Sequence, residues 1–348
     1  MAEADIIAEA AEKLFADLAT PQAAAAAENG AFPDALWRAV EDSGFVLALI
    51  PEEAGGLGID PDSAAALLRR AAYHAAPIPL PETMLAARLL AQAGIDLPPG
   101  PLALASGDMT LARTPSGWRI EGTARRVAWG AQAVALVVVA AQDGRAHVAL
   151  VPRAQYAATA GRNLADEPRD DLVIAADVPA ASVAASSVDA EGLLWRLAAL
   201  LAIQMAGALE KTLDLSVAYA GERTQFGKPI GRFQAIQQSL AAAAGQVAAA
   251  VSAASLAAEA LVRDDANASL DAAIAKARCG EAAGIVAGIA HQIHGAIGFS
   301  HEHPLRLVTR RLWAWRDEHG AEAFWNRRLG EAALAAPGGS LWRFITAA

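Results

Sequence analysis

The sequence predicts a mainly α-helical protein with one small β domain. Its 348 residues are 55% hydrophobic and rich in alanine, the strongest helix former. Residues 101–187 differ, because they hold short valine-rich runs of strand length. Four long apolar segments follow residue 188, and four such helices with short loops form an antiparallel bundle. We therefore expect an N-terminal helical domain (1–100), a middle β domain (101–187) and a C-terminal four-helix bundle (188–348).

The first hundred residues predict four helices. Proline is tolerated in a first helical turn and aspartate favours a helix N-terminus, so Pro-Asp pairs indicate where two of the helices begin. A glycine-rich loop at 51–58 and a proline-rich break at 77–81 separate the later helices. The expected helices are 2–27, a segment from Pro33-Asp34 to near Gly44, a segment beginning at Pro61-Asp62-Ser63, and 82–94.

The middle region predicts strands, and the last region predicts helices of about 30 residues, roughly 45 Å long. Residues 133–141 and 147–151 flank Gln-Asp-Gly-Arg, which is typical of a β-hairpin. The other expected strands lie at 118–122, 172–175 and around Val183. The expected bundle helices are 193–222, 234–263, 269–295 and 304–334.

Composition excludes several classes of function. The net charge of −10 argues against nucleic acid as a partner, because binding it needs a basic face. Cys279 is the single cysteine, so no internal disulfide can form, which fits a reducing cytoplasm. The first ten residues lack the basic and apolar parts of a signal peptide. The apolar runs 197–209 and 241–251 are short for a membrane span, so we expect a soluble cytoplasmic protein.

Residues 223–238 read Arg-Thr-Gln-Phe-Gly-Lys-Pro-Ile-Gly-Arg-Phe-Gln-Ala-Ile-Gln-Gln. Arg223 offers a bidentate fork for phosphate, Gln225 a hydrogen-bonding amide and Phe226 a flat face for stacking. Glycines on both sides of a proline bend the chain sharply between two helices. The block therefore has the chemistry to bind an anionic dinucleotide.

A second block begins at Gln292 and reads Gln-Ile-His-Gly-Ala-Ile-Gly-Phe-Ser-His-Glu-His-Pro. Gln292, Gly295 and Gly298 suit a backbone that lies close against a ligand. His291 and His294 share a helix face, but no further ligand completes a metal site at useful spacing, so we expect no metal and a polar subunit interface there.

Together these blocks resemble the acyl-CoA dehydrogenase flavoprotein family, as does the segment from Leu36-Trp37 to Gly58. The resemblance implies a helical, β, four-helix-bundle order, FAD as cofactor, and an oxidoreductase acting on the CH–CH bond of acyl-CoA thioesters in lipid or steroid degradation. It also implies oligomers whose FAD is shared across a subunit interface, with electron-transfer flavoprotein as acceptor. The FAD contacts that it implies are Arg223, Gln225, Phe226, Ile230, Phe233, Gln292 and Gly295.

Three parts of the family pattern are missing. The loop that covers the flavin and pantetheine is replaced by the short stretch 104–111. Arg126 stands where the family has an aromatic residue over the flavin ring, and Trp129 should point elsewhere. The family's catalytic glutamate falls on His319, next to Glu318, and these two are the only candidate bases, since its other position falls on Leu197.

This pattern is similar to the non-catalytic subunits of bacterial heteromeric steroid acyl-CoA dehydrogenases. It implies that the chain completes the FAD site of a catalytic partner subunit. Three alternatives remain open: a self-sufficient homodimer or tetramer that uses Glu318 or His319 as its base, a flavin monooxygenase of the same fold, and a scaffold without flavin. Arg126 is interpreted either as a solvated charge or as a contact of a CoA phosphate.

Overall fold

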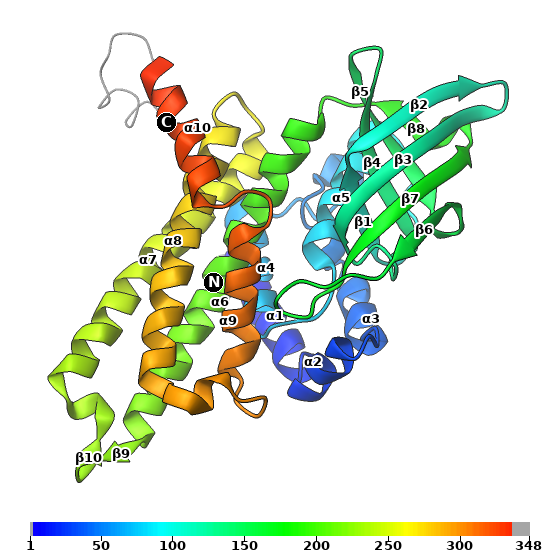
Figure 1. The fold of residues 1–348 in the computed structure, drawn as a ribbon. Coiled ribbons are helices and arrows are strands. Elements are labelled where there is room, and N and C mark those ends of the chain that lie inside the picture. The colour runs from blue at the N-terminus through cyan, green and yellow to red at the C-terminus, as the bar shows by residue number, and fades with distance from the viewer. Residues whose placement is uncertain (1–2, 336–348) are drawn as a thin grey trace. The chain divides into compact units, whose positions relative to one another are not determined.

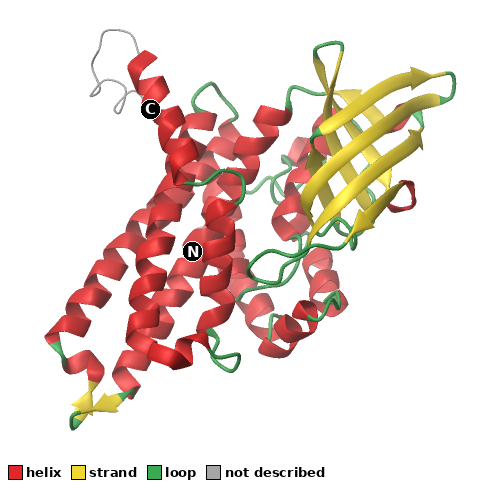
Figure 2. Cartoon of the chain, in the orientation of Figure 1, coloured by secondary structure: helices red, strands yellow, loops and turns green. Residues whose placement is uncertain are grey.

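The computed structural model describes residues 3–335, which fall into two compact units. One unit contains the chain up to Leu67 and Ala76–Leu194, and the other contains Leu68–Ala75 and the chain from Trp195 onward. Helices, two sheets and further helices follow one another along the sequence, as predicted (Figure 1; Figure 2). The division into three domains with boundaries at 100 and 187 stays a prediction.

Five α-helices precede the first strand. The expected single helix over 2–27 is wrong, because two helices occupy this stretch. Pro21 opens the second of them, and the hydroxyl of Thr20 accepts a hydrogen bond from the Ala23 N–H at 3.2 Å as its N-cap. The α-helices are α1 (Glu3–Leu18), α2 (Pro21–Glu28), α3 (Asp34–Asp42), α4 (Pro61–Tyr73) and α5 (Leu80–Ala93), with short 3-10 turns η1 (Phe45–Leu47) and η2 (Glu52–Ala54).

Two four-stranded sheets form the β part of the first unit. Their orders are β1-β4-β5-β8 and β2-β3-β7-β6, and only the β1–β4 pair is parallel among these strands. Strands β4 and β5 are joined by the predicted hairpin. The strands are β1 (Leu102–Ser106), β2 (Asp108–Thr114), β3 (Gly117–Ala128), β4 (Ala135–Gln142), β5 (Arg145–Pro152), β6 (Tyr156–Thr159), β7 (Arg169–Val178) and β8 (Val183–Ala185), with 3-10 turns η3 (Arg153–Gln155) and η4 (Ala180–Ser182).

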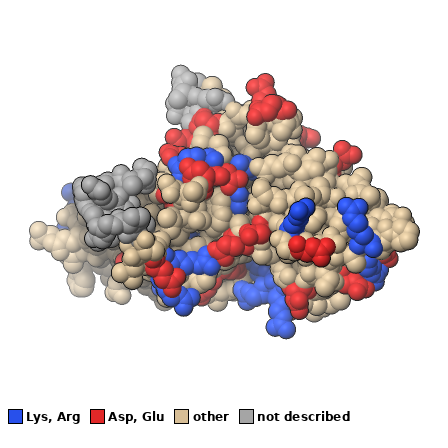
Figure 3. Space-filling view, turned by 90° about the horizontal axis from the view of Figure 1, so that it is seen from above, with Lys and Arg blue, Asp and Glu red and all other residues tan. Residues whose placement is uncertain are grey.

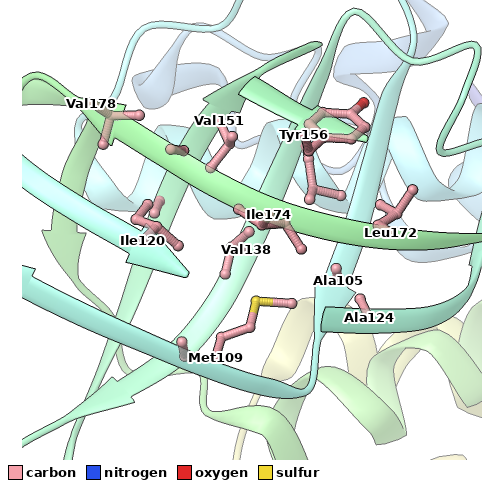
Figure 4. Packing of buried hydrophobic residues seen from close by; sticks show 14 of the residues in the cluster. Ala105, Met109, Ile120, Ala124, Val138, Val151, Tyr156, Leu172, Ile174 and Val178 are labelled. Carbon is pink, nitrogen blue, oxygen red and sulfur yellow. The ribbon is translucent and has the colours of Figure 1, made fainter. Parts of the chain in front are cut away.

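One apolar core contains side chains from both sheets (Figure 4). Along β7, Leu172, Ile174, Ala176 and Val178 are buried while the residues between them are exposed. This alternation places every second side chain in the core, as the period of a strand requires. The two sheets therefore pack face to face around one shared hydrophobic core.

The second unit is built around three long helices joined end to end by short connections. Helix α8 packs against α7, α9 and α10 (Figure 1). Alanines fill the α7–α8 contact, so the two backbones approach closely. The elements from residue 190 onward are α6 (Ala190–Glu222), β9 (Thr224–Gln225), β10 (Lys228–Pro229), η5 (Ile230–Arg232), α7 (Gln234–Arg263), α8 (Ala268–His294), η6 (Gly295–Phe299), α9 (Leu305–Asp317) and α10 (Glu322–Ala335).

The expected helix over 304–334 is wrong, because it is two helices. Helix α9 ends at Asp317 and α10 begins at Glu322. Between them His319 and Gly320 have positive φ angles of 52° and 95°, which a right-handed helix cannot contain. We call residues 317–321 the α9–α10 corner.

Helices α6, α7 and the continuous stretch of α8 and η6 are long and apolar enough to cross a bilayer by length and composition alone. These helices are longer than the apolar runs 197–209 and 241–251, from which we expected no membrane-spanning segment. In α6, 78% of the most apolar window is buried within the protein, so packing accounts for its character. In α7 the buried share is 33%.

Candidate functional site

The first predicted block lies at the tip of a β-hairpin between α6 and α7. The Arg223 N–H donates to the Tyr219 carbonyl at 2.8 Å, which completes the last turn of α6. Strand β9 then pairs with β10, and the Ile230 N–H donates to the Arg223 carbonyl at 2.8 Å. Phe226 and Gly227 form the turn, with φ angles of 50° and 81°. Two positive φ angles in succession are what a two-residue type I′ hairpin requires.

The hairpin side chains that we predicted to bind a dinucleotide point into solvent. Phe226 is 93% exposed, and Arg223 and Gln225 are also exposed. The Phe226 ring meets the Phe233 ring in a T-shaped arrangement, with centroids 6.2 Å apart. Within residues 3–335, the Arg223 guanidinium has no ion pair or hydrogen bond. A phenylalanine in the left-handed region costs conformational energy, whereas the exposed guanidinium of Arg223 is hydrated and available to a ligand.

The second predicted block lies where α8 ends. Gln292 is on the exposed side of its last turn, and Gly295 follows with φ 64° and ψ −147°. An L-residue rarely adopts this conformation, and no atom lies within 4 Å of where a Cβ would stand, so the backbone at Gly295 is open to a ligand. Gly298 is buried, and a Cβ there would come 3.1 Å from His294. Glycine is therefore needed at 295 for its backbone angles and at 298 because a side chain would not fit.

A ring stack brings the two blocks together. Tyr219 of α6 stacks on His294 of α8, with ring centroids 4.5 Å apart and planes inclined by 25°. Arg223 lies one helical turn beyond Tyr219, and Gly295 directly follows His294. The hairpin and η6 lie at the same end of α6, α7 and α8 (Figure 1). The stack thus joins segments about 70 residues apart in sequence, and we call their exposed residues together the hairpin–η6 surface.

His291 and His294 are buried within the chain, which corrects our expectation of a polar subunit interface there. The His291 ring stacks on Phe299 at 3.9 Å and on Trp313 at 5.2 Å. Burial lowers the pKa of His291, His294 and His303 below the ordinary value of histidine. Among residues 3–335, no three His, Cys, Asp or Glu side chains gather as metal ligands.

The two candidate bases lie at the α9–α10 corner. Glu318 is the extended residue that ends α9, and His319 follows in the left-handed region, so the segment is not the helix that we considered. Both side chains are half-buried. The Trp325 indole donates to the His319 and Gly320 carbonyls at 3.0 and 3.1 Å.

Lys276 holds this corner from inside the protein, and sequence reasoning missed it. Its ammonium is 1% exposed and donates at 2.8 Å to the carbonyls of Arg316 and of Gly320. Burial lowers its pKa to about 8, although Glu322, Glu318 and Asp317 act in the opposite direction. The available signal was a lone lysine within an otherwise apolar stretch of α8.

The sequence from residue 190 to 332 matches the family model described as "Acyl-CoA dehydrogenase, C-terminal domain", and residues 1–96 match the N-terminal domain of the same family. The chain belongs to the acyl-CoA dehydrogenase family. The acyl-CoA dehydrogenase IpdE2 of Mycolicibacterium smegmatis is 32% identical over 317 residues, which are 89% of this chain and 92% of that protein. The acyl-CoA dehydrogenase FadE27 of Mycobacterium tuberculosis is 32% identical over 79% of this chain and 81% of its own length.

Solved structures agree with this assignment. A chain of the ChsE4-ChsE5 complex from Mycobacterium tuberculosis superposes with a TM-score of 0.86 at 25% identity, covering 97% of this chain and 99% of that chain. A chain of the Tcur3481-Tcur3483 steroid ACAD gives 0.83 at 25% identity over 99% of both chains. The predicted fold class is confirmed: an acyl-CoA dehydrogenase fold with a β region between helical regions. Members of this family are flavoprotein oxidoreductases that use FAD.

The hairpin–η6 surface fits one part of FAD. Arg223 supplies an unpaired guanidinium for a pyrophosphate, and Phe226 supplies an exposed aromatic face. Gly295 exposes backbone beside the amide of Gln292. Ala296, which replaces a glycine usual in the family, is exposed and does not enter the core. The residues present therefore suit the dinucleotide end of the cofactor.

The β sheets of this chain do not fit the flavin ring of FAD. Strand β1 ends at Ser106 and β2 begins at Asp108, so Gly107 alone replaces the loop that covers flavin in this family, as the shortness of 104–111 predicted. A Cβ on Gly107 would come 2.9 Å from the Thr123 carbonyl oxygen, which shows how tight the turn is.

The aromatic residue that stacks on the flavin is also missing. Strand β3 has a bulge between Ala124 and Val127, where Arg126 is exposed with a φ angle of 54°. Its N–H donates to the Asp171 carboxylate at 2.9 Å. Trp129 is buried and meets the edge of Phe32 at 5.9 Å, so it points elsewhere, as expected. Neither Arg126 nor Trp129 therefore supplies an exposed aromatic face at this strand.

Proposed function

We propose that this chain is a subunit of an FAD-dependent acyl-CoA dehydrogenase and completes the FAD site of a catalytic partner subunit. The observation that carries the proposal is the single-residue β1–β2 connection at Gly107, in a chain whose dinucleotide-binding hairpin is intact and exposed. A protein that bound its own FAD would need both parts. A protein that serves a neighbour needs only the hairpin.

The role of the chain in this assembly is to bind and orient the cofactor. Arg223 pairs with the pyrophosphate, Phe226 stacks on a ring, and the Gln292–Gly295 segment lies along the adenosine end. Bound FAD supplies the oxidant for removing two hydrogens from the CH–CH bond of an acyl-CoA. The carboxylate that removes the α-proton comes from the partner, because neither His319 nor Glu318 has the setting of an apolar-pocket carboxylate.

The comparisons support a heteromeric assembly and a steroid-derived acyl group. Two of the similar structures are described as complexes of two different chains, and one of these is described as a steroid ACAD. We extend both properties to this chain as part of the proposal. The substrate is then a steroid side-chain acyl-CoA thioester, the acceptor is electron-transfer flavoprotein, and the complex works in the cytoplasm.

The first experiment is to purify the chain alone and to record its absorption spectrum and its mass in solution. The proposal expects a colourless protein that becomes yellow only on co-expression with a catalytic acyl-CoA dehydrogenase, with about one flavin for two chains. A yellow homo-oligomer with about one flavin per chain would overturn it. A protein that stays colourless with every tested partner would favour the scaffold, and NAD(P)H-dependent oxygenation the monooxygenase.

A second candidate function is a self-sufficient dehydrogenase, and the α9–α10 corner favours it. Lys276 and Trp325 fix the backbone where the family's catalytic glutamate stands, with His319 directly before Gly320. A neutral imidazole can accept a proton. Bleaching of the chain's own flavin by an acyl-CoA without oxygen would identify this function.

A further inference from the structure

The rings of Tyr219, His294 and His303 all contact one another at the end of the bundle. They are distinct from the exposed residues that we propose to contact FAD. Tyr219 and His294 stack as described above. His303, from the loop before α9, meets the His294 ring at 4.8 Å and the Tyr219 ring at 6.3 Å, edge-on in both cases. His294 is 4% exposed, and the Tyr219 and His303 rings that cover it are half-buried.

Hydrogen bonds define the protonation of the two buried α8 imidazoles. His294 Nδ1 donates to the Ala290 carbonyl at 2.8 Å, so in the neutral ring Nε2 carries the lone pair. The Thr309 hydroxyl donates to the Leu305 carbonyl, so it accepts from His291 Nε2 at 3.0 Å. Within residues 3–335, His294 Nε2 and His291 Nδ1 are buried without a hydrogen-bond partner. A proton bound at either nitrogen would be buried, and at His294 the carbonyl of Leu215 compensates only in part for the lost hydration.

The same rings determine the spacing of the hairpin–η6 surface. Tyr219 is followed one turn later by Arg223, and His294 is followed at once by Gly295. The η6 turn lies directly against the two histidines, because a Cβ on Gly298 would come 3.1 Å from the Cβ of His294 and 3.2 Å from Nδ1 of the His291 ring. A change in the stack therefore moves one half of the surface relative to the other.

We propose that the Tyr219–His294 stack positions the Arg223 hairpin against the Gly295 turn, and that protonation of the buried His294 imidazole separates the hairpin from the turn and releases the dinucleotide. This inference rests on the proposed function and adds a regulatory property to the same surface. Tyr219 and His294 act as positioning residues, since neither is exposed to the ligand as Arg223 and Phe226 are.

The direction of the pH effect follows from the surroundings of His294. The titratable groups that face it are Tyr219 on α6, His291 on its own helix and His303 before α9. Burial disfavours its charged form more than the carbonyls of Ala290 and Leu215 favour it, and no carboxylate is among the groups that shift its pKa. Acid therefore opposes the stacked arrangement, and neutral pH favours it.

The test measures FAD release from the holo-complex with its catalytic subunit, by flavin fluorescence between pH 7.5 and 5.5. We expect the apparent Kd for FAD to rise on acidification by about tenfold for each unit of pKa difference between the stacked and separated states. The His294→Phe variant keeps a stacking ring that cannot titrate, so its Kd should stay flat. The exposed His301 lies in the same segment, so His301→Phe is the matched control and should behave like the wild type.

Tyrosine variants test the positioning role without titration. Tyr219→Leu should weaken FAD binding at least fivefold at every pH, and Tyr219→Phe should restore it, because the stack needs only the ring. A wild-type pH profile in His294→Phe, or wild-type binding in Tyr219→Leu, would overturn the inference. Far-UV circular dichroism identifies a variant that fails to fold.

Two further readouts separate the inference from the proposed function. If Arg223→Ala keeps its FAD, the proposed function fails. If Arg223→Ala loses FAD while His294→Phe retains the wild-type pH profile, only the inference fails. In the isolated chain, the NMR signals of the His294 imidazole and of the Tyr219 ring should shift over the same pH range. Independent titration of the two rings would also contradict the stack as a switch.

Discussion

Lys276 is the clearest case of a single side chain that stabilises a local backbone. Helix α9 ends with carbonyl groups that lack helical partners, and the ammonium of Lys276 donates to one of them, that of Arg316, and also to that of Gly320. Gly280 and Gly284, one and two turns along α8, leave room for the paired Glu322 and Arg316 side chains. A buried ammonium is costly, and these contacts offset its desolvation only in part, because the pKa of Lys276 stays lowered.

Lys276→Met should remove one pH dependence of stability. The pKa of Lys276 is about 8 in the folded protein, whereas an unfolded lysine titrates near 10.4. The unfolded chain therefore binds more protons between these values, and the free energy of unfolding should rise with pH by on the order of 3 kcal/mol across this window. Urea midpoints of wild type and variant between pH 7.5 and 10 measure the difference. Parallel curves would show that Lys276 does not titrate there.

His319→Ala decides between the two functions proposed for the chain. In a supporting subunit, kcat of the complex should change less than about twofold, because the base belongs to the partner. In a self-sufficient enzyme, kcat should fall about a hundredfold or more, the usual contribution of a general base. Glu318→Gln, assayed beside it, tests the other candidate. Steady-state kinetics with an acyl-CoA and an artificial electron acceptor provide the measurement.

At the scale of elements, the sequence predicts the regular helices well. The predicted helices 193–222 and 234–263 occur as 190–222 and 234–263, because alanine-rich segments of this length have no competing structure. The β4–β5 hairpin also occurs as predicted. Strands β1, β2 and β6 were missed. Strands β1 and β2 are joined by one residue, which gives no turn pattern, and β6 has four residues.

Helices α4 and α6 approach each other so closely at Gly207 that no side chain fits there. A Cβ at this position of α6 would overlap the Arg69 carbonyl of α4. The close approach allows Glu210 to accept from Arg69 at 2.7 Å and from Arg70 at 3.0 Å. The Tyr73 hydroxyl donates to Asp214 at 2.8 Å one turn farther.

Gly207→Ala should therefore destabilise the protein, by about 1–3 kcal/mol for overpacking at a helix contact. Gly221→Ala is the matched control, because it makes the same change in α6 where no atom lies within 4 Å of the new methyl group. Alanine is the better helix former, so the control should be neutral or more stable by up to about 1 kcal/mol. Thermal unfolding of both variants tests this pair, and equal stabilities would contradict the packing argument.

At the scale of the whole molecule, the sequence singled out the residues that we propose to contact FAD but did not predict the contacts that hold them in place. Arg223 and Gly295 are recognisable from residue type and spacing alone. The Tyr219–His294 stack and the Lys276 contacts arise between distant helices, and no local pattern encodes them. Charge was informative only as a total: on the face shown in Figure 3, Lys and Arg lie among Asp and Glu, without a broad field of either sign.

The chain should lose stability in mild acid. Burial lowers the pKa values of His291, His294 and His303, so the unfolded chain binds more protons as pH falls through about 6.5, and the free energy of unfolding decreases. Urea midpoints at pH 7.5, 6.5 and 5.5 should decline. The double variant His291→Phe/His294→Phe should decline less, whereas His301→Phe should follow the wild type. Equal slopes for all three proteins would exclude the buried histidines as the cause.

The exposure of Phe226 at the hairpin tip has a consequence for handling the enzyme. A cofactor bound between two chains is retained only while those chains stay together, so mass action links FAD occupancy to protein concentration. In the proposed assembly, dilution below the dissociation constant of the subunits would release FAD together with the partner, and added FAD would favour reassembly. The amount of each subunit that a cell makes would then set how much active cofactor it holds.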